Sequence, residues 1–474
     1  MLREVKTENG IIRGLVGNNA RITAFRGVPF AKPPVGDLRW KAPQPAENWD
    51  GVYEAYEFKN ISMQDTPGVK EDGLYEREWF PDSKVPIGED SLYLNIWTSA
   101  KTTDDKLPVL VWFHGGAFQW GYSYEMEFNG ENLAKRGIVV VSVPYRMGLF
   151  GFFAAPELSK DQPEAPTNFG LLDQQAGLKW VKRNIKAFGG DPDKITIAGQ
   201  SAGGASTMMQ MVSPQNKGMI KSAIIQSGII NNPFYDDPII MPAPLAKAEK
   251  RGVEFMEYVG VSDYRELKKM DAFELRAQYA EFAKGHERFV PCTDGVFLPD
   301  DPIKMFMNND YDTVPLMAGN TEDEFQTKVP KEYADKPAYK EAISGLESAI
   351  KATFANKENC YYYRFTCDIP GEDNPGTFHS VDLWFFFETL ANCWRPLVGR
   401  HYDLARQMCN YWANFIKTGN PNGNDSDGTP MAEWKPYSPD ERNEMIFSGK
   451  GPYTLVDTDP FTECIAQEII KKYR

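Results

Sequence analysis

Ser201 is the residue of this chain whose surroundings best suit nucleophilic chemistry. It stands in the stretch GQSAG at 199–203, after an apolar, β-branched run at 195–198 and before a run typical of a helix at 205–211. A serine at such a strand–turn–helix position has a strained backbone, and glycines beside it leave room for the crowded strand and helix. We therefore predict that Ser201 is a covalent nucleophile; the alternative is an ordinary helix N-cap.

A serine hydroxyl needs a base to take its proton, and the chain has four histidines. His379 has the required placement, because it follows a predicted strand at 361–365 and a turn-rich loop at 370–376, downstream of the serine. His114 lies upstream in a strand-end loop, and we expect it to be structural. His286 in a polar segment is predicted to face solvent, and His401 at a helix start is predicted to be structural.

A third group must orient the base, and it should lie between the serine and the histidine in sequence. Three adjacent carboxylates, Glu322, Asp323 and Glu324, follow a predicted strand at 314–318. Residue type alone does not distinguish them, and two of the three are expected to be solvated or helix-capping charges.

The chemistry also needs backbone N–H groups that stabilise an oxyanion. One should come from Ala202, directly after the serine. The others should come from the loop HGGA at 114–117, because it follows a predicted strand at 109–113 and its glycines let the backbone approach a substrate.

Strands and helices alternate through the centre of the chain, as positioning these groups requires. Apolar runs at 109–113, 138–143, 195–198 and 223–225 predict buried strands, and apolar spacings of three and four predict a helix over 171–188. This order implies an α/β protein with a large, mostly parallel, twisted sheet covered by helices on both faces. At the start, 4–7 and 11–13 flank the turn pair Asn9-Gly10 and predict a β-hairpin.

Two regions depart from the alternation. Residues 245–284 predict consecutive helices with a capping-box-like start at Asp271, and we expect them to form a lid or pocket wall inserted over the carboxyl edge of the sheet. Residues 400–474 predict a helix at 404–418 and a polar loop at 419–428. We expect 1–474 to form a single domain.

Composition and charge exclude some functions. The 474 residues carry a net charge of −14, which disfavours nucleic acid and anionic membranes. The first residues have no apolar stretch, and the apolar run at 138–143 falls well short of a membrane helix, so we predict neither a signal peptide nor a span. Six cysteines fit no metal motif and are predicted to be free thiols of a cytoplasmic protein.

Further motifs make the chain resemble, over nearly its whole length, the type-B carboxylesterases. This family of α/β-hydrolase fold includes bacterial esterases such as para-nitrobenzyl esterases, animal carboxylesterases, cholinesterases and the non-catalytic neuroligins. The motifs are FRGVPFAKPPVG at 25–36, EDSLYLN at 89–95, YRMGLFGF at 145–152, NFGLLDQ at 168–174, AFGGDP at 187–192 and GQSAGG at 199–204.

The resemblance assigns roles to residues. It implies that Glu324 is the acid of the triad, and it matches His379 to the family pattern His-x-x-acidic-Leu. It implies oxyanion donors at Gly116, Ala117 and Ala202, and it implies no metal or cofactor. It also implies two structural ion pairs, joining Arg39 to Glu89 and Arg146 to Asp173.

The chain departs from the family pattern at four points. Ser91 stands in place of a disulfide cysteine, and 61–64 lacks the partner cysteine, as expected in a reducing cytosol. Gln200 stands where glutamate is usual; one fewer buried charge changes the titration of the base, in a direction that the sequence leaves open. Ala117 replaces an oxyanion glycine. The segment from Glu324 to His379 is shorter than usual, which predicts a more open site.

We therefore expect a serine carboxylesterase in which His379 activates Ser201 and later protonates the leaving alcohol. Activity should fall as the imidazole protonates. The predicted substrates are short-chain or aromatic esters, hydroxycinnamoyl (feruloyl) esters included. Aromatic residues near the site either fill the core or line a pocket: Phe118, Trp120, Tyr122, Tyr124, Phe128 and those at 384–387.

The sequence gives less support to other functions. A non-catalytic binding protein of the neuroligin type would lack the serine. A lipase acting at lipid surfaces needs an apolar lid, and 245–284 is too polar. An amidase or peptidase with the same triad stays open, and so does the choice between monomer and dimer.

Overall fold

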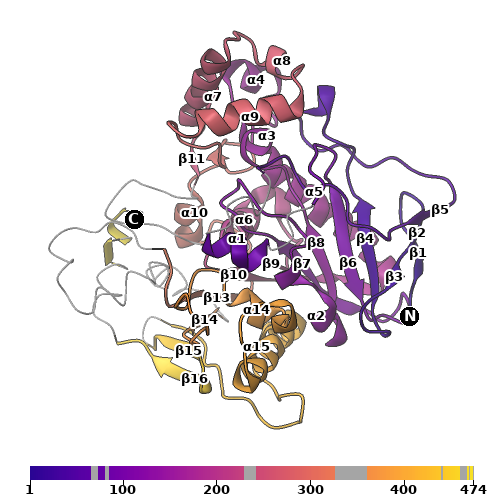
Figure 1. The fold of residues 1–474 in the computed structure, drawn as a ribbon, viewed down its shortest axis with the longest axis vertical. Coiled ribbons are helices and arrows are strands. Elements are labelled where there is room, and N and C mark those ends of the chain that lie inside the picture. The colour runs from indigo at the N-terminus through magenta and orange to yellow at the C-terminus, as the bar shows by residue number, and fades with distance from the viewer. Residues whose placement is uncertain are drawn as a thin grey trace.

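The computed structural model describes residues 1–65, 73–80, 85–228, 242–325, 360–438, 441–458, 467–468 and 470–472. In these residues a mixed sheet of 11 strands crosses the molecule in the order β16-β15-β14-β13-β10-β9-β7-β8-β6-β4-β3 (Figure 1). Seven neighbouring strands, from β15 to β8, run parallel, and the strands outside them are antiparallel. The predicted α/β class with a mostly parallel central sheet is therefore confirmed.

The parallel strands are β7 (Leu107–Phe113), β8 (Val139–Val143), β9 (Gly190–Gln200), β10 (Ser222–Gln226), β13 (Leu316–Thr321), β14 (Cys360–Phe365) and β15 (Asn443–Ser448). The antiparallel strands are β3 (Leu15–Val16), β4 (Thr23–Pro29), β6 (Tyr93–Thr98) and β16 (Gly451–Val456). A separate three-stranded sheet joins β1 (Glu4–Lys6), β2 (Ile11–Arg13) and β5 (Val52–Glu54). The antiparallel pairing of β1 with β2 is the predicted hairpin.

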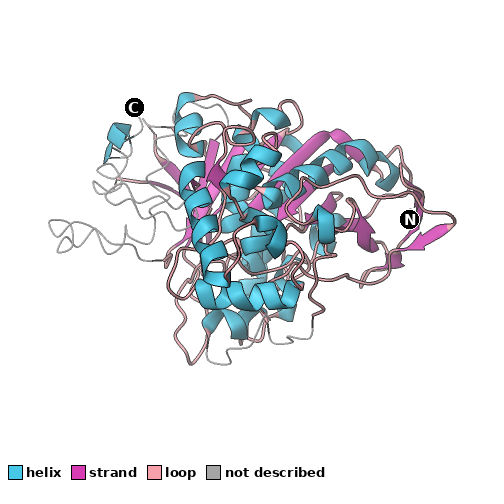
Figure 2. Cartoon of the chain, turned by 90° about the horizontal axis from the view of Figure 1, so that it is seen from above, coloured by secondary structure: helices cyan, strands magenta, loops and turns pink. Residues whose placement is uncertain are grey.

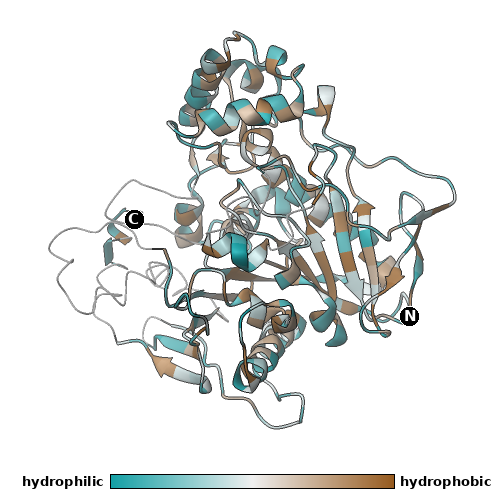
Figure 3. Cartoon of the chain, viewed as in Figure 1, coloured by the Kyte–Doolittle hydropathy of each residue, from teal (hydrophilic) through white to brown (hydrophobic). Residues whose placement is uncertain are grey.

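Each face of the central sheet is buried against its own core. Along β7, Val109, Val111 and Phe113 belong to one apolar cluster, and Leu110 and Trp112 belong to the other. Successive side chains of a strand point to opposite faces, so a strand buried on both faces must be apolar throughout. Figure 3 shows the result as mainly hydrophobic central strands.

Helices cover both faces (Figure 2). One core contains side chains of α3 (Gly148–Phe152), α5 (Phe169–Asn184), α6 (Ala202–Val212) and α10 (Pro302–Asn308). The other contains side chains of α2 (Glu131–Lys135), α14 (Leu383–Phe386) and α15 (Gly399–Thr418). The helix predicted over 171–188 is α5 followed by the 3-10 turn η3 (Ile185–Phe188). The other 3-10 turns are η1 (Gly36–Leu38), η2 (Met126–Phe128), η4 (Pro214–Asn216) and η6 (Leu390–Asn392).

The region 245–284 forms the predicted consecutive helices. They are α7 (Leu245–Val259), α8 (Tyr264–Leu267) and α9 (Ala272–Phe282), which lie with α4 (Pro156–Asp161) at the top of Figure 1. The Asp271 carboxylate accepts from the N–H groups of Phe273 and Glu274, so it caps α9 as predicted. The short strands β11 (Ala243–Pro244) and β12 (Cys292–Thr293) pair at the base of this region.

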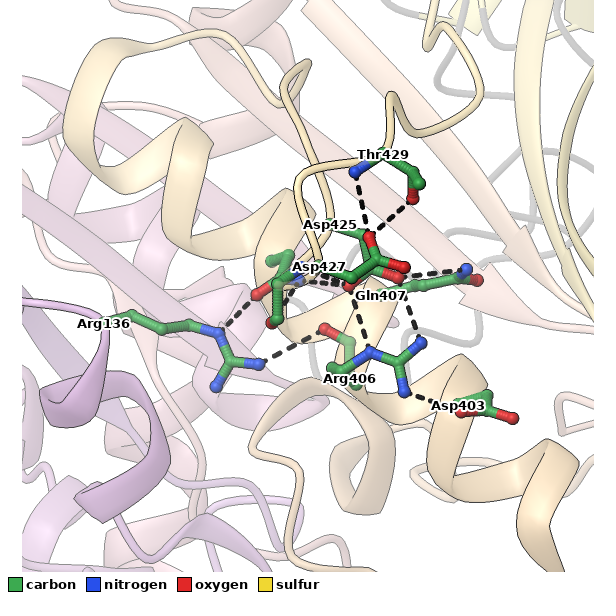
Figure 4. A network of polar contacts seen from close by, with 9 residues as sticks. Arg136, Asp403, Arg406, Gln407, Asp425, Asp427 and Thr429 are labelled. Atoms are coloured by element: carbon green, nitrogen blue, oxygen red, sulfur yellow. Dashed lines mark hydrogen bonds and ion pairs between the residues drawn. The ribbon is translucent and has the colours of Figure 1, made fainter.

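The prediction for 400–474 was incomplete. The helix predicted at 404–418 is α15, but β15 and β16 lie where no strand was predicted. The polar loop is held against α15 by the network in Figure 4, in which Arg406 binds both carboxylate oxygens of Asp425 at 3.0 and 3.1 Å. Arg136, near α2, donates to Asn410 on α15 at 2.6 Å and extends the network across two elements.

Within the described ranges, no helix combines the length and apolar character needed to cross a bilayer.

Candidate active site

Ser201 occupies a sharp turn between β9 and α6. Its backbone has φ +56° and ψ −125°, a region that residues with a side chain rarely adopt. Two hydrogen bonds fix the turn: Ser201 N–H donates to Gln226 O on β10, and Ala205 N–H donates to Ser201 O, both at 2.9 Å. The turn places the serine at the carboxyl end of β9, as the motif predicts.

The glycines beside the serine are required by crowding. A Cβ atom on Gly203 would lie 2.0 Å from the carbonyl oxygen of Phe113, and one on Gly199 would lie 2.2 Å from the carbonyl oxygen of Gly203. These oxygens belong to backbone, which cannot move aside without distorting β7 or α6. The predicted reason for glycine at both flanking positions is therefore confirmed.

His379 and Glu324 meet at the carboxyl ends of the neighbouring strands. A bridge between Asp323 and Phe378 brings their two loops together, and Glu324 Oε2 accepts a hydrogen bond from His379 Nδ1. Both side chains are buried, with 7% of the Glu324 and 4% of the His379 side chain exposed. A buried carboxylate on Nδ1 leaves Nε2 as the proton-accepting nitrogen of the neutral ring.

The charge of Glu324 is stabilised despite its burial. Burial opposes ionisation, but the nearby His379 ring and hydrogen bonds from His379, Ser227 and Thr321 together lower the pKa of Glu324. Ser227 Oγ donates to Oε1 at 2.5 Å, and Thr321 donates to the same oxygen from its N–H at 3.1 Å. Glu324 is therefore held as a carboxylate in a fixed orientation.

The other two candidate carboxylates lie elsewhere. Asp323 Oδ2 accepts from Thr377 N–H at 2.7 Å and so fastens the loop that carries His379. The Glu322 side chain is exposed. Of the three acids that residue type left open, only Glu324 contacts the histidine.

Gln200 lies against the free nitrogen of the histidine. Its Nε2 is 3.2 Å from His379 Nε2, so the amide donates to the nitrogen that would accept the Ser201 proton. Across the described ranges, no hydrogen bond joins Ser201 Oγ to His379. Such bonds are often long in substrate-free enzymes and tighten when substrate binds.

The predicted oxyanion donors belong to the loop at 114–117 and to the start of α6. Gly116 and Ala117 have φ values of +100° and +52°, and Ala202 is the first residue of α6. In the parts of the chain that the structure covers, their three N–H groups donate to no protein acceptor. A Cβ atom on Gly115 would lie 3.2 Å from Ser201 Cβ, so the loop lies directly against Ser201.

Comparison with known proteins agrees with this geometry. A family model described as the carboxylesterase family matches residues 2–353 and 338–454. The chain belongs to the carboxylesterase family. As a carboxylesterase it is a carboxylic ester hydrolase of α/β-hydrolase fold.

Among the relatives of this carboxylesterase, a bile salt-activated lipase of Bos taurus is 32% identical over 94% of this chain and 83% of its own length. A para-nitrobenzyl esterase of Bacillus subtilis (strain 168) is 29% identical over 97% of both chains. A solved PNB esterase structure superposes with a TM-score of 0.80 at 27% identity, covering 99% of each chain. A carboxylesterase of Geobacillus stearothermophilus gives 0.79 at 29% identity, covering 98% of this chain and 99% of its own.

The remaining histidines of the carboxylesterase have the structural or surface positions predicted for them. His114 is buried against Tyr145 with ring centroids 4.5 Å apart, and burial lowers the pKa of His114 to about 4. His286 is exposed and stacks on Phe282. His401 is buried at the start of α15.

Two features of the site were missed at the sequence level. Ser227 directly follows β10, and a polar residue after a buried strand was the available signal. Phe325 follows Glu324, and its ring centroid lies 4.5 Å from that of His379 while 43% of the residue is exposed. The ring of Tyr75 on α1 (Leu74–Trp79) lies 6.2 Å from that of Phe325.

Most of the aromatic residues predicted near the site fill the core. Buried members are Phe118, Tyr122, Phe128, Trp384, Phe385, Phe386 and Phe387. Tyr124 is half-buried and stacks on Phe58 at 4.3 Å. Trp120 is 37% exposed and lines a cavity beside the oxyanion loop. The prediction that these aromatic residues fill the core is therefore confirmed for all of them except Tyr124 and Trp120.

Both ion pairs implied by the resemblance are present. Arg39 contacts Glu89 at 2.6 Å, and Arg146 contacts the fully buried Asp173 at 2.7 Å. Neither pair reaches the serine, in keeping with a structural role.

Two serines stand where the resemblance places a disulfide in secreted members. The hydroxyl oxygens of Ser62 and Ser91 are 3.1 Å apart and share a hydrogen bond, and Ser62 also donates to Tyr145 O at 2.6 Å. Cys292, Cys367, Cys393 and Cys409 are free thiols, and Cys464 lies outside the described residues. Most of the short segment before His379, 326–359, also lies outside them, so the openness of the site stays a prediction.

A cavity of about 310 Å³ lies far from Ser201 and His379. It is lined by the segment after α6 and by 309–314, which precede β10 and β13. It therefore opens at the amino edge of the sheet, opposite the serine, and is not the active site.

Proposed function

We propose that this chain hydrolyses carboxylic esters through an acyl-enzyme on Ser201, with His379 as general base and acid and Glu324 as the group that orients it. The observation that carries the proposal is the buried Glu324–His379 pair beside a strained serine turn. A fixed carboxylate on Nδ1, an unprotonated Nε2 and a serine on a nucleophile elbow are the parts that acyl transfer needs.

The reaction has two halves. His379 Nε2 takes the Ser201 proton as Oγ attacks the ester carbonyl, and the imidazolium then protonates the departing alcohol. A water molecule enters, gives its proton to Nε2 and attacks the acyl-enzyme, and the serine regains its proton when the acid leaves.

The N–H groups of Gly116, Ala117 and Ala202 stabilise the oxyanion in both halves. Their freedom from protein acceptors supports this role, because donors that are already aligned need no reorganisation during the reaction.

The proposed substrates are short-chain or aromatic esters, hydroxycinnamoyl (feruloyl) esters included. Phe325 supports this choice, because an exposed ring beside His379 offers an apolar surface to a small acyl or aryl group. We also propose that 1–474 is one domain, that 245–284 forms a wall of the site, and that the protein works in the cytoplasm. The Ser62–Ser91 pair supports the cytoplasmic location, since a pair of serines, unlike a disulfide, needs no oxidising compartment.

The test is steady-state hydrolysis of aryl, short-acyl and long-acyl esters by the wild type and by Ser201→Ala. The proposal expects kcat/KM to be greatest for short or aromatic esters and Ser201→Ala to lose at least about a thousandfold. A preference for long acyl chains would refute the substrate proposal, and undiminished activity of Ser201→Ala would refute the mechanism.

A further inference from the structure

A cavity of about 140 Å³ lies between the oxyanion loop and α9, and three cations line it. We call it the cationic pocket and define it by Arg276, Lys284 and Arg288, with Gln119, Trp120 and Tyr279 in its wall. A positive cluster is unexpected in a chain of net charge −14. The alternative is an ordinary charged surface, on which each cation is hydrated by solvent or paired with a carboxylate.

Arg276 does not fit that alternative, whereas Arg288 is exposed to solvent. The Arg276 Nη1 atom donates to Gln64 O at 3.0 Å, but its Nε is buried and has no hydrogen-bond partner in the described structure. The Arg288 guanidinium lies 4.4 Å over the Trp120 ring and forms no ion pair within the described residues. A half-buried guanidinium without a carboxylate partner among the described residues is costly, so an anion at Arg276 would stabilise the pocket.

The other charges leave the pocket positive. Lys284 pairs with Glu281 at 2.7 Å, an exposed pair that solvent screens. Among the described residues, Asp65 is the one carboxylate lining the cavity, and it is exposed. The two arginines therefore outweigh the single lining carboxylate.

The pocket adjoins the reaction centre through one loop. Trp120 N–H donates to Gly116 O at 2.9 Å, so the pocket wall and the proposed oxyanion donors belong to the same turn. Tyr279 on α9 donates to Gln119 Oε1 at 2.8 Å and accepts from Phe289 N–H at 3.0 Å, which fixes the opposite wall. The pocket therefore lies one loop away from Ser201.

We propose that the cationic pocket binds a carboxylate, or a similar anionic group, of the ester substrate, so that esters carrying a negative charge away from the scissile carbonyl are preferred. This inference rests on the proposed ester hydrolysis at Ser201. Guanidinium groups match a carboxylate with paired N–H donors, and the Trp120 and Tyr279 rings suit the apolar part between the two groups.

The experiment compares esters that differ only in charge. One pair carries the charge on the alcohol side, 4-acetoxybenzoate against 4-acetoxybenzamide. The other carries it on the acyl side, the 4-nitrophenyl monoester of adipic acid against its terminal amide. The proposal expects KM for the anion to be about tenfold lower in at least one pair, with the preference reduced as salt rises from about 0.05 to about 0.5 M.

Variants connect the preference to the pocket. Arg288→Gln and Arg276→Gln should each reduce the preference severalfold while leaving the neutral esters unaffected, and Arg276→Lys should retain part of it. Lys450→Gln is the matched control, because it removes one exposed positive charge in the turn between β15 and β16. It should leave the preference unchanged.

The possible failures are distinguishable. Neutral esters hydrolysed as well as their anionic partners in both pairs would overturn the pocket and leave the esterase proposal standing. An anion preference that survives Arg288→Gln with Arg276→Gln would also overturn it. Failure to hydrolyse any of the four esters would overturn the proposed function itself.

Discussion

Replacing Gln200 by glutamate tests the electrostatics of the proposed base. The amide nitrogen of Gln200 lies 3.2 Å from His379 Nε2, so the substitution puts a carboxylate oxygen at hydrogen-bond distance from the nitrogen that must accept the Ser201 proton. The family usually has glutamate here, so the variant should fold.

The size of the effect follows from the distance. Two unit charges about 4 Å apart attract by about 4 kcal/mol at an effective dielectric constant near 20. Part of this is offset by the desolvation of the new carboxylate at a buried position. Since one pH unit corresponds to about 1.4 kcal/mol, we expect the acidic limb of the pH–rate profile to be displaced by about 1 to 2 pH units.

The sign follows from the charge of the ring. A carboxylate stabilises the imidazolium, and the imidazolium cannot accept the serine proton. The acidic limb of the pH–rate profile therefore moves to higher pH in Gln200→Glu, and the loss of activity is greatest near neutrality. Among the described residues, Asp382, whose pKa burial raises to about 6, and Glu324 also lie near the ring, and both are unchanged.

The assay is kcat/KM for an uncharged ester from about pH 5 to 9, because this parameter reports the ionisations of the free enzyme. Gln200→Met is the matched control: it removes the hydrogen bond without adding a charge, and its acidic limb should stay within about 0.5 unit of the wild type, well below the expected carboxylate effect. If the limb of Gln200→Glu coincides with that of the wild type, the nitrogen beside Gln200 is not the titrating base, and the reasoning fails.

Three further predictions concern the surrounding scaffold. Asp173→Asn leaves Arg146 buried without its ion-pair partner and should lower the free energy of unfolding by about 3–5 kcal/mol; an unchanged urea midpoint would contradict this. Joint replacement of Ser62 and Ser91 by cysteine, at an oxygen separation of 3.1 Å, should form a disulfide worth about 2–4 kcal/mol, seen as a melting temperature that falls on reduction, whereas two titratable thiols would refute it. Gly203→Ala puts a methyl group 2.0 Å from a backbone oxygen and should reduce kcat/KM at least about a hundredfold, so wild-type activity would disprove the crowding argument.

The sequence was most informative where chemistry and backbone geometry coincide. The pattern around Ser201 specifies a close approach of strand and helix, and such an approach excludes side chains at fixed positions, so a local pattern is enough. A local pattern is also enough for the loop at 114–117, because its two glycines let the backbone approach the proposed substrate site. The choice of Glu324 over its neighbours needed the family resemblance, because three adjacent acids differ only in what a distant loop brings to them.

Features that depend on contacts between residues far apart in the sequence could not be predicted from a local pattern. Ser227 is an unremarkable polar residue until β10 is known to lie between β9 and β13. Strand β15 includes Glu444, which lies 3.6 Å from Arg364 on β14, and a buried charge hides a strand from an apolar pattern. Aromatic residues after the oxyanion loop were equally suited to core and pocket until packing placed most of them inside.

The identity of the nucleophile is tested most directly by labelling the protein with a fluorophosphonate and locating the adduct by peptide mass spectrometry. The account predicts one adduct on the peptide that contains Ser201, formed in the wild type and absent in Ser201→Ala. An adduct on another residue, or undiminished labelling of Ser201→Ala, would contradict it.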